Sequence, residues 1–480
     1  MKSFHIAGLP SVEFSETEVE IIRRAQHAAH KLNVPAYLIG GYVRDKILQR
    51  PCKDMDFMCL GNGIEFAESA ASFFSPSPAV NVFKHFGTAQ FRVSEVDVEF
   101  VGARKESYSA DSRNPAVEAG TLEDDLSRRD FTINTLAFEL VSESEGNFVD
   151  RFGGLKDLSE GIIKTPLDAD ITFSDDPLRM MRAIRFASQL SFVIEEKTFE
   201  AIKRNAARIK IISAERITDE MNKIILSPKP SVGFDLMYKS GLLEIIFPEF
   251  VALAGTEMKE GKGHKDNFYH TLQVLDNICE KSDDLWLRWA AVLHDIAKPL
   301  TKRFEPGTGW TFHGHEAKGA RMVPKLFRRF KLPLNEKMKF VEKLVALHLR
   351  PISLSKDQVT DSAVRRLMFE AGDDVDALMQ LCEADITSKN EKKVIRFRRN
   401  FELVRIKMKE VEEKDHIRNF QPPISGELIM EVFGLKPSKI VGEIKDSIRE
   451  AILDGKLSNN YEEAYQFMVE EAGRRGVKKI

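Results

Sequence analysis

Cysteine is scarce in this sequence of 480 residues, and its spacing excludes two classes of protein. The chain has four cysteines, without the paired spacing of a zinc site and without a disulfide framework. They are Cys52, Cys59, Cys279 and Cys382. A reducing compartment suits this composition, so we expect a cytoplasmic protein.

Long apolar runs and a dominant charge are also missing. No stretch approaches the roughly 20 apolar residues of a membrane span, and the first residues lack the basic start and apolar run of a secretory leader. We therefore expect no membrane partner. The chain has 71 Lys and Arg and 74 Asp and Glu, so the two signs nearly balance. The net charge therefore does not attract nucleic acid, and any nucleic-acid surface must be a local basic patch.

The organisation of the chain changes near residue 150. Its length predicts two to four domains. Between residues 36 and 138, short apolar runs such as AYLIG, DFMCL, AQFRV and VDVEFVGA alternate with helical stretches such as 64–74. After Gly153 and Gly154 the strand signals fade, and apolar residues recur at helical spacing. We therefore predict an α+β multidomain fold, with an N-terminal mixed sheet followed by all-α domains.

The most informative segment is LIGGYVRDKILQRPCKDMDF, in which two glycines lie between an apolar strand and a helix. Gly40 and Gly41 would let backbone N–H groups approach a phosphate. Residues two apart in a strand point to the same face, so Asp54 and Asp56 would present two carboxylates side by side. Carboxylate oxygens are hard ligands that suit Mg²⁺.

A third acid in the strand VDVEFVGARKE could complete this site. Glu99 is our choice, with Asp97 as the nearer rival. Two ions held in this way could activate an attacking 3′-hydroxyl and stabilise the leaving pyrophosphate. Alternating acids also occur on the solvent face of many strands. Asp54 and Asp56 alone are therefore also compatible with a solvated strand face that binds no metal.

The joint pattern is more specific than the acids alone. In order, GGYVRD, KDMDF, RRDFTINTLAF and DRFGGLKDL resemble the class II tRNA nucleotidyltransferases and the related bacterial poly(A) polymerases, a branch of the polymerase beta superfamily. This resemblance implies a polymerase beta-like head in which Gly40 and Gly41 hold the triphosphate and Asp54 and Asp56 bind Mg²⁺. The other head residues that match its motifs are Arg44, Asp45, Arg128, Arg129, Asp130 and Asn134. The resemblance implies that the last four contact ribose and phosphates. The alternative is a structural role, as a capping pair on the surface and a buried side-chain amide.

The segment FSDDPLRMMRAIRFASQL carries a second set of candidates. Asp176 and Arg179 are spaced i,i+3, which predicts one helix face from which they offer an acceptor and a donor to a base edge. The family motif is usually Glu-Asp-x-x-Arg, and here Asp175 replaces the Glu. A solvated salt bridge is the alternative. Three further residues complete the set: Arg182 as a nucleotide-binding candidate, and Arg216 and Glu220 as supports implied by the next motif.

A different constellation lies downstream, where an adjacent His-Asp pair falls on an apolar helix. Burying both would be costly unless they share a metal or a tight hydrogen-bond network, and this donor set suits divalent metals. The order His, His-Asp, Asp resembles the HD phosphohydrolase superfamily, which implies activity on 2′,3′-cyclic phosphates or phosphomonoesters. The candidate ligands, enough for two metals of unspecified identity, are His270, His294, Asp295, His315, His348 and Asp385. His313 lies between them in sequence, whereas His264 and His416 are interpreted as core histidines.

Local basic clusters could contact RNA. They span 325–331, 392–401 and 473–479, and their interleaved Phe residues could equally be the core stripe of a helix. Residues 391–414 predict a long amphipathic helix. The terminal segment, with Gly426, Gly434 and Gly442, resembles the helical tail of the family, which implies a grip on the tRNA elbow.

These observations combine into one hypothesis. We predict a head (1–150), a nucleotide-selecting neck (151–230), an HD domain (231–400) and an RNA-binding tail (401–480). The enzyme would add CCA, or part of it, to the tRNA 3′ end from CTP and ATP with two Mg²⁺ ions. A poly(A) polymerase is the nearest alternative. An HD phosphohydrolase with a transfer-inactive, RNA-binding head is the alternative of a different class, and a purely structural RNA-binding protein is the third.

Overall fold

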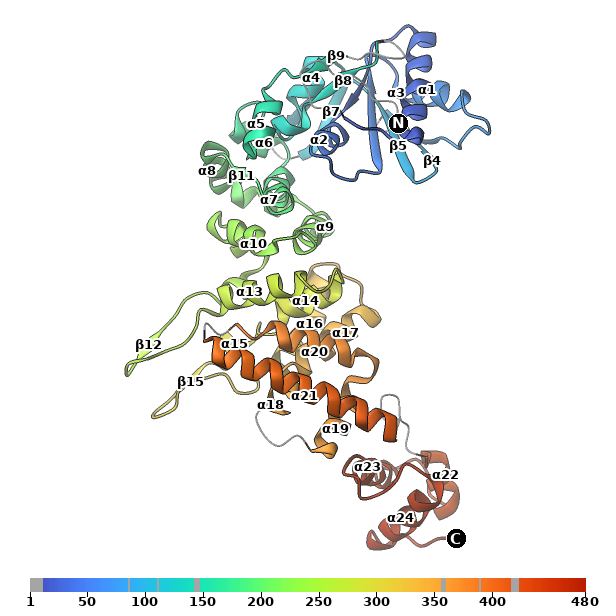
Figure 1. Cartoon of the computed structure of the whole chain (residues 1–480), viewed down its shortest axis with the longest axis vertical. Coiled ribbons are helices and arrows are strands. Elements are labelled where there is room, and N and C mark those ends of the chain that lie inside the picture. The colour runs from blue at the N-terminus through green and yellow to red at the C-terminus, as the bar shows by residue number, and fades with distance from the viewer. Residues whose placement is uncertain are drawn as a thin grey trace. The chain divides into compact units, whose positions relative to one another are not determined.

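The computed structural model describes residues 12–84, 87–109, 112–141, 147–354, 360–387, 390–415 and 423–480 (Figure 1). The chain forms two compact units, residues 1–247 and 248–480. They are called unit 1 and unit 2, and each is described by itself.

Unit 1 contains a seven-stranded mixed sheet in the order β3-β4-β5-β2-β1-β8-β9. Its strands are β1 (Ala36–Ile39), β2 (Asp54–Cys59), β3 (Asn81–Phe83), β4 (Thr88–Val93), β5 (Val96–Gly102), β8 (Ala137–Glu139) and β9 (Asn147–Val149). Strands β2 and β5 run parallel, whereas the other neighbouring pairs are antiparallel. The mixed sheet predicted from the short apolar runs is confirmed.

The two faces of β2 and β5 differ in chemistry, because side chains alternate along a strand. Phe57 and Phe100 are buried on one face, with ring centroids 5.2 Å apart. Phe66 of helix α3 (Gly63–Ser72) packs edge-on against Phe100 at 5.0 Å. The helix comes this close because Gly63 has no Cβ, which would lie 2.6 Å from the backbone of Gly102. The opposite face carries the acids, followed along the strands by Met58 and Val101, which belong to a second hydrophobic cluster.

Helices make up most of the rest of unit 1. They are α1 (Glu16–Leu32), α2 (Gly41–Ile47), α4 (Leu122–Ser127), α5 (Gly154–Glu160), α6 (Ala169–Asp175), α7 (Leu178–Leu190), α8 (Glu196–Asn205), α9 (Ala214–Ile225), α10 (Pro230–Lys239) and α11 (Leu242–Ile246). Two small sheets accompany them: β6 (Arg104–Ser109) with β7 (Ser112–Ala119), and β10 (Ile162–Ile163) with β11 (Val193–Ile194).

Unit 2 is mostly helical, as the apolar spacing predicts. Its helices are α12 (Pro248–Val251), α13 (Asn267–Cys279), α14 (Leu285–Leu293), α15 (Lys298–Thr301), α16 (His315–Arg329), α17 (Glu336–Leu347), α18 (Arg350–Leu354), α19 (Asp361–Ala371), α20 (Val375–Ala384), α21 (Glu391–Asp415), α22 (Gly426–Phe433), α23 (Lys439–Leu453) and α24 (Tyr461–Arg474). The long helix predicted over 391–414 is α21. Within the described ranges, no helix is both long enough and apolar enough to cross a membrane.

The strands β10 and β11 of unit 1 already depart from the prediction that everything after residue 153 is helical. Two hairpins of unit 2 depart from it as well. They are β12 (Met258–Lys259) with β13 (Lys262–Gly263), and β14 (Arg303–Glu305) with β15 (Gly309–Thr311). Glycines in the turns permit the reversals, since Gly261 has φ +73° and Gly307 has φ +84°. Strands of two or three residues are too short to give an alternating pattern in sequence.

Candidate active sites

The predicted metal acids lie together on one face of the unit 1 sheet. Parallel pairing of β2 and β5 sets Asp56 directly opposite Glu99, and Asp54 opposite Asp97. Burial raises the pKa of Asp56 to about 7; Arg129 opposes this, while the nearby carboxylates of Glu99 and Asp54 add to it. Such a concentration of carboxylates fits a hard divalent cation, which would relieve their repulsion.

The rival acid, Asp97, lies on the same face of β5 as Glu99 but has different neighbours. Asp97 is 55% exposed, and its Oδ1 lies 3.7 Å from the Nε of Arg92, on the neighbouring strand β4. Glu99 is among the groups that perturb the pKa of Asp56. This difference favours Glu99 as the third acid.

Gly40 lies between the acids and an arginine. It has φ +77°, a conformation that side chains rarely adopt, and it caps the N-terminus of α2. A Cβ built there would lie 3.0 Å from Nη1 of Arg129 and 3.5 Å from Oδ2 of Asp56. A side chain at this position would therefore push both functional groups away. Gly41 follows as the first residue of the helix.

Arg128 and Arg129 share one anchor, Asp125, which the sequence analysis missed. Asp125 lies on α4, and its side chain is fully buried. Its Oδ2 accepts hydrogen bonds from Nε and Nη2 of Arg129 at 3.3 and 3.1 Å. Its Oδ1 accepts from Nε of Arg128 at 3.0 Å and also from Nη2. Burial opposes ionisation, but the two arginines outweigh it and lower the pKa of Asp125. The signal in sequence was the i,i+3 and i,i+4 spacing in DDLSRRD.

Asp125→Asn should therefore weaken nucleotide binding. Asparagine keeps the shape but loses the charge that fixes two guanidinium groups, and hydrogen bonds to charged groups contribute roughly 1.5–3 kcal/mol. We expect the KM for nucleotide to rise by about tenfold to a hundredfold, with a smaller effect on kcat. Steady-state kinetics would measure this, with Asp124→Asn as the matched control because Asp124 is half-buried and contacts Thr121 instead of the two arginines. An unchanged KM in the Asp125 variant would remove this anchor from the account.

Asp130 and Asn134 form a buried polar network behind the arginines. Asp130 accepts from Nε of Arg182 at 2.7 Å and from Nδ2 of Asn134 at 2.9 Å. Asn134 in turn accepts from Nη1 of Arg44 at 2.6 Å. Burial opposes ionisation of Asp130, but Arg182 and Asn134 hold its pKa well below the usual range. Arg44 also donates to both oxygens of Asp45, so its guanidinium is engaged inside the protein. Arg44 is therefore suited to positioning Asn134.

The predicted base-reading residues line a cavity of about 410 Å³ in unit 1. Arg179 donates from Nη2 to the backbone oxygen of Arg128 at 2.7 Å, which joins the cavity to the arginine pair. The lining residues are Arg128, Arg129, Asp130, Asp176, Leu178, Arg179, Arg182, Arg216, Asp219, Glu220 and Lys223. Asp219 and Lys223 lacked a motif of their own in sequence.

The prediction that Asp176 and Arg179 share a helix face is wrong in one respect. Helix α6 ends at Asp175 and α7 begins at Leu178, so Asp176 lies between them with extended backbone (φ −132°, ψ 99°). Its Oδ1 accepts a hydrogen bond from the N–H of Leu178 at 3.1 Å. The reason is Pro177, since a residue before proline is disfavoured in the helical region. Asp176 still faces the same cavity as Arg179.

Arg216 and Glu220, the two predicted support residues, stabilise the lining of this cavity. Nη2 of Arg216 lies 3.7 Å from Oδ2 of Asp176. Glu220 is buried, and it accepts from Nε of Arg185 at 2.6 Å and from Nζ of Lys223 at 3.2 Å. These contacts tie α9 to α7.

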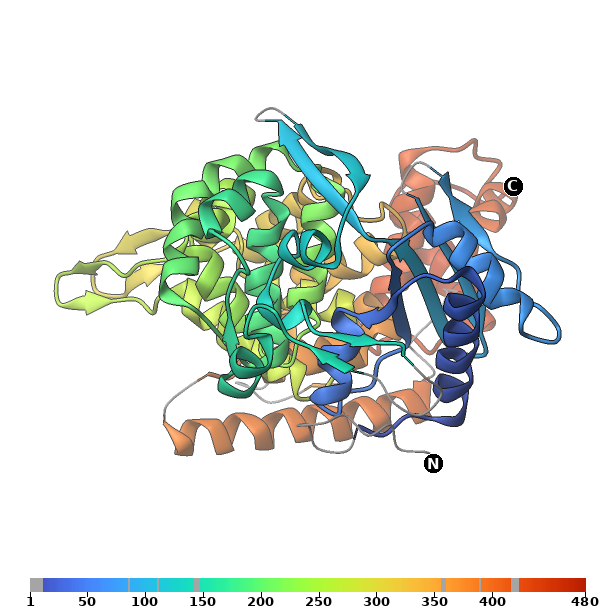
Figure 2. The same cartoon turned by 90° about the horizontal axis from the view of Figure 1, so that it is seen from above.

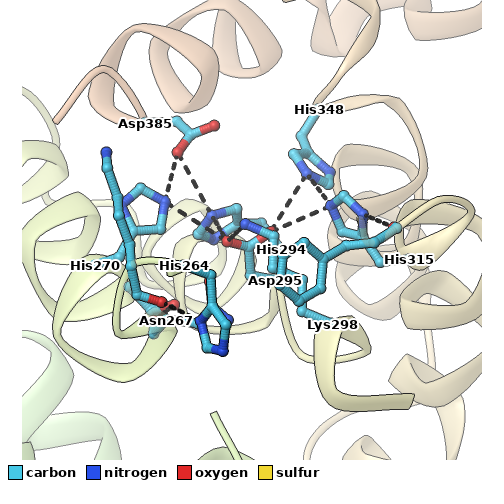
Figure 3. A network of polar contacts seen from close by, with 12 residues as sticks. His264, Asn267, His270, His294, Asp295, Lys298, His315, His348 and Asp385 are labelled. Atoms are coloured by element: carbon cyan, nitrogen blue, oxygen red, sulfur yellow. Dashed lines mark hydrogen bonds and ion pairs between the residues drawn. The ribbon is translucent and has the colours of Figure 1, made fainter. Parts of the chain in front are cut away.

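Unit 2 gathers the predicted histidines and aspartates into one cluster at helix ends (Figure 3). The histidine–aspartate cluster consists of His270 on α13, His294 and Asp295 after α14, His315 at the start of α16, His348 at the end of α17 and Asp385 at the end of α20. It contains two groups of three whose ligand atoms lie within 4.8 Å of one another: His270, His294 and Asp385, and Asp295, His315 and His348.

Asp295 stands between the two groups, as Figure 3 shows. Its Oδ2 lies 3.2 Å from Nε2 of His294 and 3.6 Å from Nε2 of His270. Its Oδ1 lies 3.3 Å from Nε2 of His315 and 3.9 Å from Nε2 of His348. Asp295 would therefore help to hold a divalent metal with His315 and His348, and its other oxygen faces His270 and His294.

The histidine hydrogen bonds fit metal binding. Nδ1 of His294, His315 and His348 lies 2.7–2.8 Å from a backbone carbonyl oxygen three residues earlier, which assigns the proton to Nδ1. Nε2 of each ring then points into the cluster, and Nε2 of His315 and His348 lie 3.3 Å apart. Nε2 of His294 is buried and has no hydrogen-bond partner among the described residues. Converging Nε2 atoms beside carboxylates form a donor set that suits a divalent cation.

The charges of the cluster favour a positive group at its centre. Burial disfavours protonated His294, but Asp295 and Asp385 outweigh it and raise its pKa. Burial and His294 together lower the pKa of His348 to about 4, so His348 stays neutral. Asp295 also accepts from Nζ of Lys298 at 2.5 Å. Both the carboxylate and the neutral histidine are in the forms that ligate metals.

Three other histidines are outside the cluster or outside the description. His313 is exposed, and His264 accepts a hydrogen bond from the N–H of Glu257 at 3.3 Å. The core interpretation of His264 holds only in part, since its side chain is half-buried. His416 lies outside the described residues.

Three of the four phenylalanines in the basic segments belong to the core, and the fourth, Phe397, is half-buried. Phe327, Phe330 and Phe401 are all at most 4% exposed. The alternative of an amphipathic core stripe is therefore confirmed for these three residues.

Strand-borne acids beside a glycine cap, followed by helices and a histidine–aspartate cluster, define a nucleotidyltransferase joined to an HD-type metal domain. Residues 36–164 match the poly(A) polymerase head domain, residues 191–253 match a family described as the probable RNA- and SrmB-binding site of polymerase A, and residues 267–389 match the HD domain. The chain belongs to the class II CCA-adding tRNA nucleotidyltransferase family.

Individual relatives support this membership. The chain is 32% identical to the A-adding tRNA nucleotidyltransferase of Deinococcus radiodurans over 360 residues, 71% of this chain and 77% of that protein. It is 33% identical to the multifunctional CCA protein of Shewanella frigidimarina over 305 residues, 62% of this chain and 70% of that protein. The fold is similar to the Bacillus stearothermophilus CCA-adding enzyme in complex with CTP, with a TM-score of 0.66 at 23% identity over 96% of this chain and 99% of that one.

Proposed function

We propose that this chain extends the 3′ end of tRNA without a template, adding CCA or part of it from CTP and ATP. One observation carries the proposal: Asp56 and Arg129 both lie beside Gly40, Asp125 holds Arg129 and Arg128 together, and Arg179 donates to the carbonyl of Arg128. These contacts join a carboxylate site to a polar cavity large enough to take a base. A transferase that selects its own nucleotide needs both parts linked.

The roles in this proposal follow from the contacts. Asp54, Asp56 and Glu99 would hold two Mg²⁺ ions, which would supply Lewis-acid stabilisation of charge on the transferred phosphate and the leaving pyrophosphate. Gly40 and Gly41 leave room for the triphosphate. Arg128 and Arg129, fixed through Asp125, would bind ribose and phosphate oxygens.

Base selection would fall to Asp176 and Arg179. Cytosine and adenine both carry an exocyclic amino group that a carboxylate can accept from, whereas uracil and guanine present a carbonyl at that position. Arg179 offers donors beside it. Because Arg179 is held by the carbonyl of Arg128 and Asp176 lies near Arg216, the pair forms a fixed edge that can replace a nucleic-acid template.

Asp176→Ala should lower both rate and discrimination. We expect kcat/KM for CTP and ATP to fall by about tenfold to a hundredfold, because a good base-edge contact contributes roughly 1–3 kcal/mol. Misincorporation of UTP and GTP should change much less. Single-nucleotide incorporation assays would measure both, with Asp170→Ala as the control, since Asp170 lies on α6 and pairs with Arg204. Equal losses for all four nucleotides would argue against a base-reading role.

The proposed function is tested by sizing products on tRNAs that lack one, two or three terminal nucleotides, with CTP, ATP, both or neither. Three additions that require both nucleotides would establish complete CCA addition. One adenosine added only to tRNA ending in CC would establish A addition. A long adenosine ladder would indicate a poly(A) polymerase, and no extension would contradict the proposal.

A second activity is favoured by the histidine–aspartate cluster. We propose that it hydrolyses 2′,3′-cyclic or terminal phosphates of RNA with divalent ions that the two groups of ligands in the cluster would hold. The bound ions would supply Lewis-acid stabilisation of the phosphate. The protein groups would hold them through four Nε2 atoms and two carboxylates, while Lys298 neutralises Asp295. Removing such phosphates would leave the hydroxyl that unit 1 extends.

Two further predictions remain proposals. The divisions near residues 150, 230 and 400 would separate head, neck, HD domain and tail. A cytoplasmic location is consistent with four free cysteine thiols.

A further inference from the structure

The two β-hairpins of unit 2 form one projecting structure, called here the paired hairpins (258–263 and 303–311). Both leave the helices in the same direction in Figure 1 and in Figure 2. Nζ of Lys262 donates to the backbone oxygen of Gly307, and its Cδ would lie 3.0 Å from a Cβ at Gly309. Side-chain contacts therefore hold the hairpins together.

The paired hairpins combine cations with aromatic rings. Nζ of Lys259 lies 4.8 Å from the ring centre of Phe304, and Nζ of Lys302 lies 4.5 Å from that of Trp310. The two rings meet edge-on at 5.3 Å. Lys259, Lys262 and Arg303 are exposed. Cations beside aromatic rings suit a single nucleic-acid strand, whose phosphates and bases need both.

Two of the three acidic side chains in and beside the paired hairpins contact neighbouring side chains. Glu257 pairs with Lys302 at 2.8 Å, and Glu305 accepts a hydrogen bond from Thr311 at 3.2 Å. Glu260 lies in the turn of the first hairpin. Four basic residues, Lys259, Lys262, Lys302 and Arg303, therefore outnumber three acids, Glu257, Glu260 and Glu305.

A continuous series of ring contacts leads from the paired hairpins to the histidine–aspartate cluster. Trp310 meets His264 at 5.6 Å, and His264 meets Phe312 at 5.8 Å. Nζ of Lys298 lies 5.7 Å from the Phe312 ring centre and donates to Asp295. The carbonyl of Phe312 also orients His315. The basic and aromatic surface thus begins beside the ligands of the proposed metal site.

Trp310 also has an unsatisfied hydrogen-bond donor. Its Nε1 atom is buried and has no hydrogen-bond partner in the described part of the chain. An indole N–H can only donate, and an unsatisfied buried donor costs roughly 1–3 kcal/mol. A small rotation of the ring toward an acceptor on a bound strand would recover that cost.

We propose that the paired hairpins bind the single-stranded 3′-terminal segment of an RNA and lead its terminal phosphate into the histidine–aspartate cluster. This inference rests on the proposed phosphohydrolase function. The strand's phosphates meet Lys259, Lys262 and Arg303, and its last bases lie against the aromatic series toward Phe312. An isolated mononucleotide reaches the cluster without using this surface.

The test compares two charge-neutralising double variants. Lys259→Gln with Arg303→Gln removes two cations of the paired hairpins, and Lys337→Gln with Lys339→Gln removes two exposed lysines of α17 as the matched control. Hydrolysis is followed on a 12-nucleotide RNA ending in a 2′,3′-cyclic phosphate and on cyclic 2′,3′-CMP. We expect the hairpin variant to raise KM for the RNA roughly three- to tenfold and to lower its salt slope by about 1.4. Cyclic CMP hydrolysis should be unchanged, and the control should match the parent protein.

Three outcomes would overturn the inference: the same KM for RNA in both variants, equal losses on cyclic CMP, or competition by polyglutamate as strong as by RNA. The last would point to an acidic protein partner. If the parent protein hydrolyses neither substrate, the proposed hydrolase function fails. The hairpin site is then judged by crosslinking the same RNA through a 4-thiouridine near its 3′ end. Crosslinks to residues 258–264 or 303–312 support it, and their absence overturns it.

Discussion

Asp56→Asn should abolish nucleotide transfer while the protein stays folded. Asparagine keeps the size of the side chain but removes one charge from the group formed with Asp54 and Glu99, so the site can no longer hold divalent ions. We expect kcat to fall by at least about 1000-fold, which corresponds to about 4 kcal/mol. Single-turnover incorporation of labelled CTP or ATP into tRNA would measure the loss.

The control for this variant lies on the neighbouring strand. Asp97→Asn should retain nearly full transfer because Asp97 lies beside Arg92, whereas Glu99→Gln should resemble Asp56→Asn because Glu99 lies directly opposite Asp56. A larger loss of transfer in Asp97→Asn than in Glu99→Gln would make Asp97 the third metal ligand in place of Glu99. Substantial transfer by Asp56→Asn, with more than a tenth of the parent rate, would contradict the assignment of the whole site.

The pH dependence of Mg²⁺ binding gives an independent readout of the same site. The folded-state pKa of Asp56 is raised to about 7, above its ordinary unfolded value. Its protonated form therefore favours folding at low pH, and that contribution is lost as pH rises through about 7. Mg²⁺ needs the deprotonated form, so calorimetry should show affinity rising up to about pH 7 and levelling above it. Asp56→Asn should lose this dependence.

Asp295→Asn should have the second large effect, on hydrolysis alone. Both oxygens of Asp295 face ligand groups, one toward His270 and His294 and the other toward His315 and His348. Removing the charge should therefore weaken both metal sites at once. We expect phosphohydrolase activity to fall by at least about 1000-fold and the metal content per chain to drop, while transfer by unit 1 continues.

Two further variants distinguish loss of metal binding from loss of folding. His315→Gln touches one ligand group, so it should remove one metal ion per chain in elemental analysis and keep the other. His313→Ala alters an exposed neighbour outside the cluster and should behave as the parent protein. Unchanged metal content and hydrolysis in Asp295→Asn would contradict a metal site at Asp295, and loss of transfer would show that the two activities are coupled.

Local sequence patterns carried much of the fold and of the unit 1 site. Strand alternation alone put Asp54 and Asp56 on one face. It could not choose between Asp97 and Glu99, because both lie on the same face of β5; the choice depends on side-chain surroundings such as Arg92. Asp176 was misplaced because the i,i+3 pattern was given more weight than Pro177, which breaks the helix.

The burial of Asp125 and the short strands of unit 2 could not be predicted from sequence patterns. Asp125 sits among several acids, and its burial follows from tertiary packing that no local spacing reveals. The set of histidines in unit 2 was predicted, but its division into two groups across Asp295 depends on how five helix ends meet. The paired hairpins escaped notice because their strands have two or three residues each.

The central claim is that one chain carries a hydrolytic centre and a transfer centre that act on the same RNA end. The most direct measurement uses a tRNA that lacks its terminal nucleotides and ends in a 2′,3′-cyclic phosphate, supplied with CTP, ATP and divalent metal. The parent protein should extend it, Asp295→Asn should extend only the matched tRNA with a free hydroxyl, and Asp56→Asn should remove the phosphate without extension. Extension of the blocked tRNA by Asp295→Asn, or no extension of the free tRNA by the parent protein, would contradict the account.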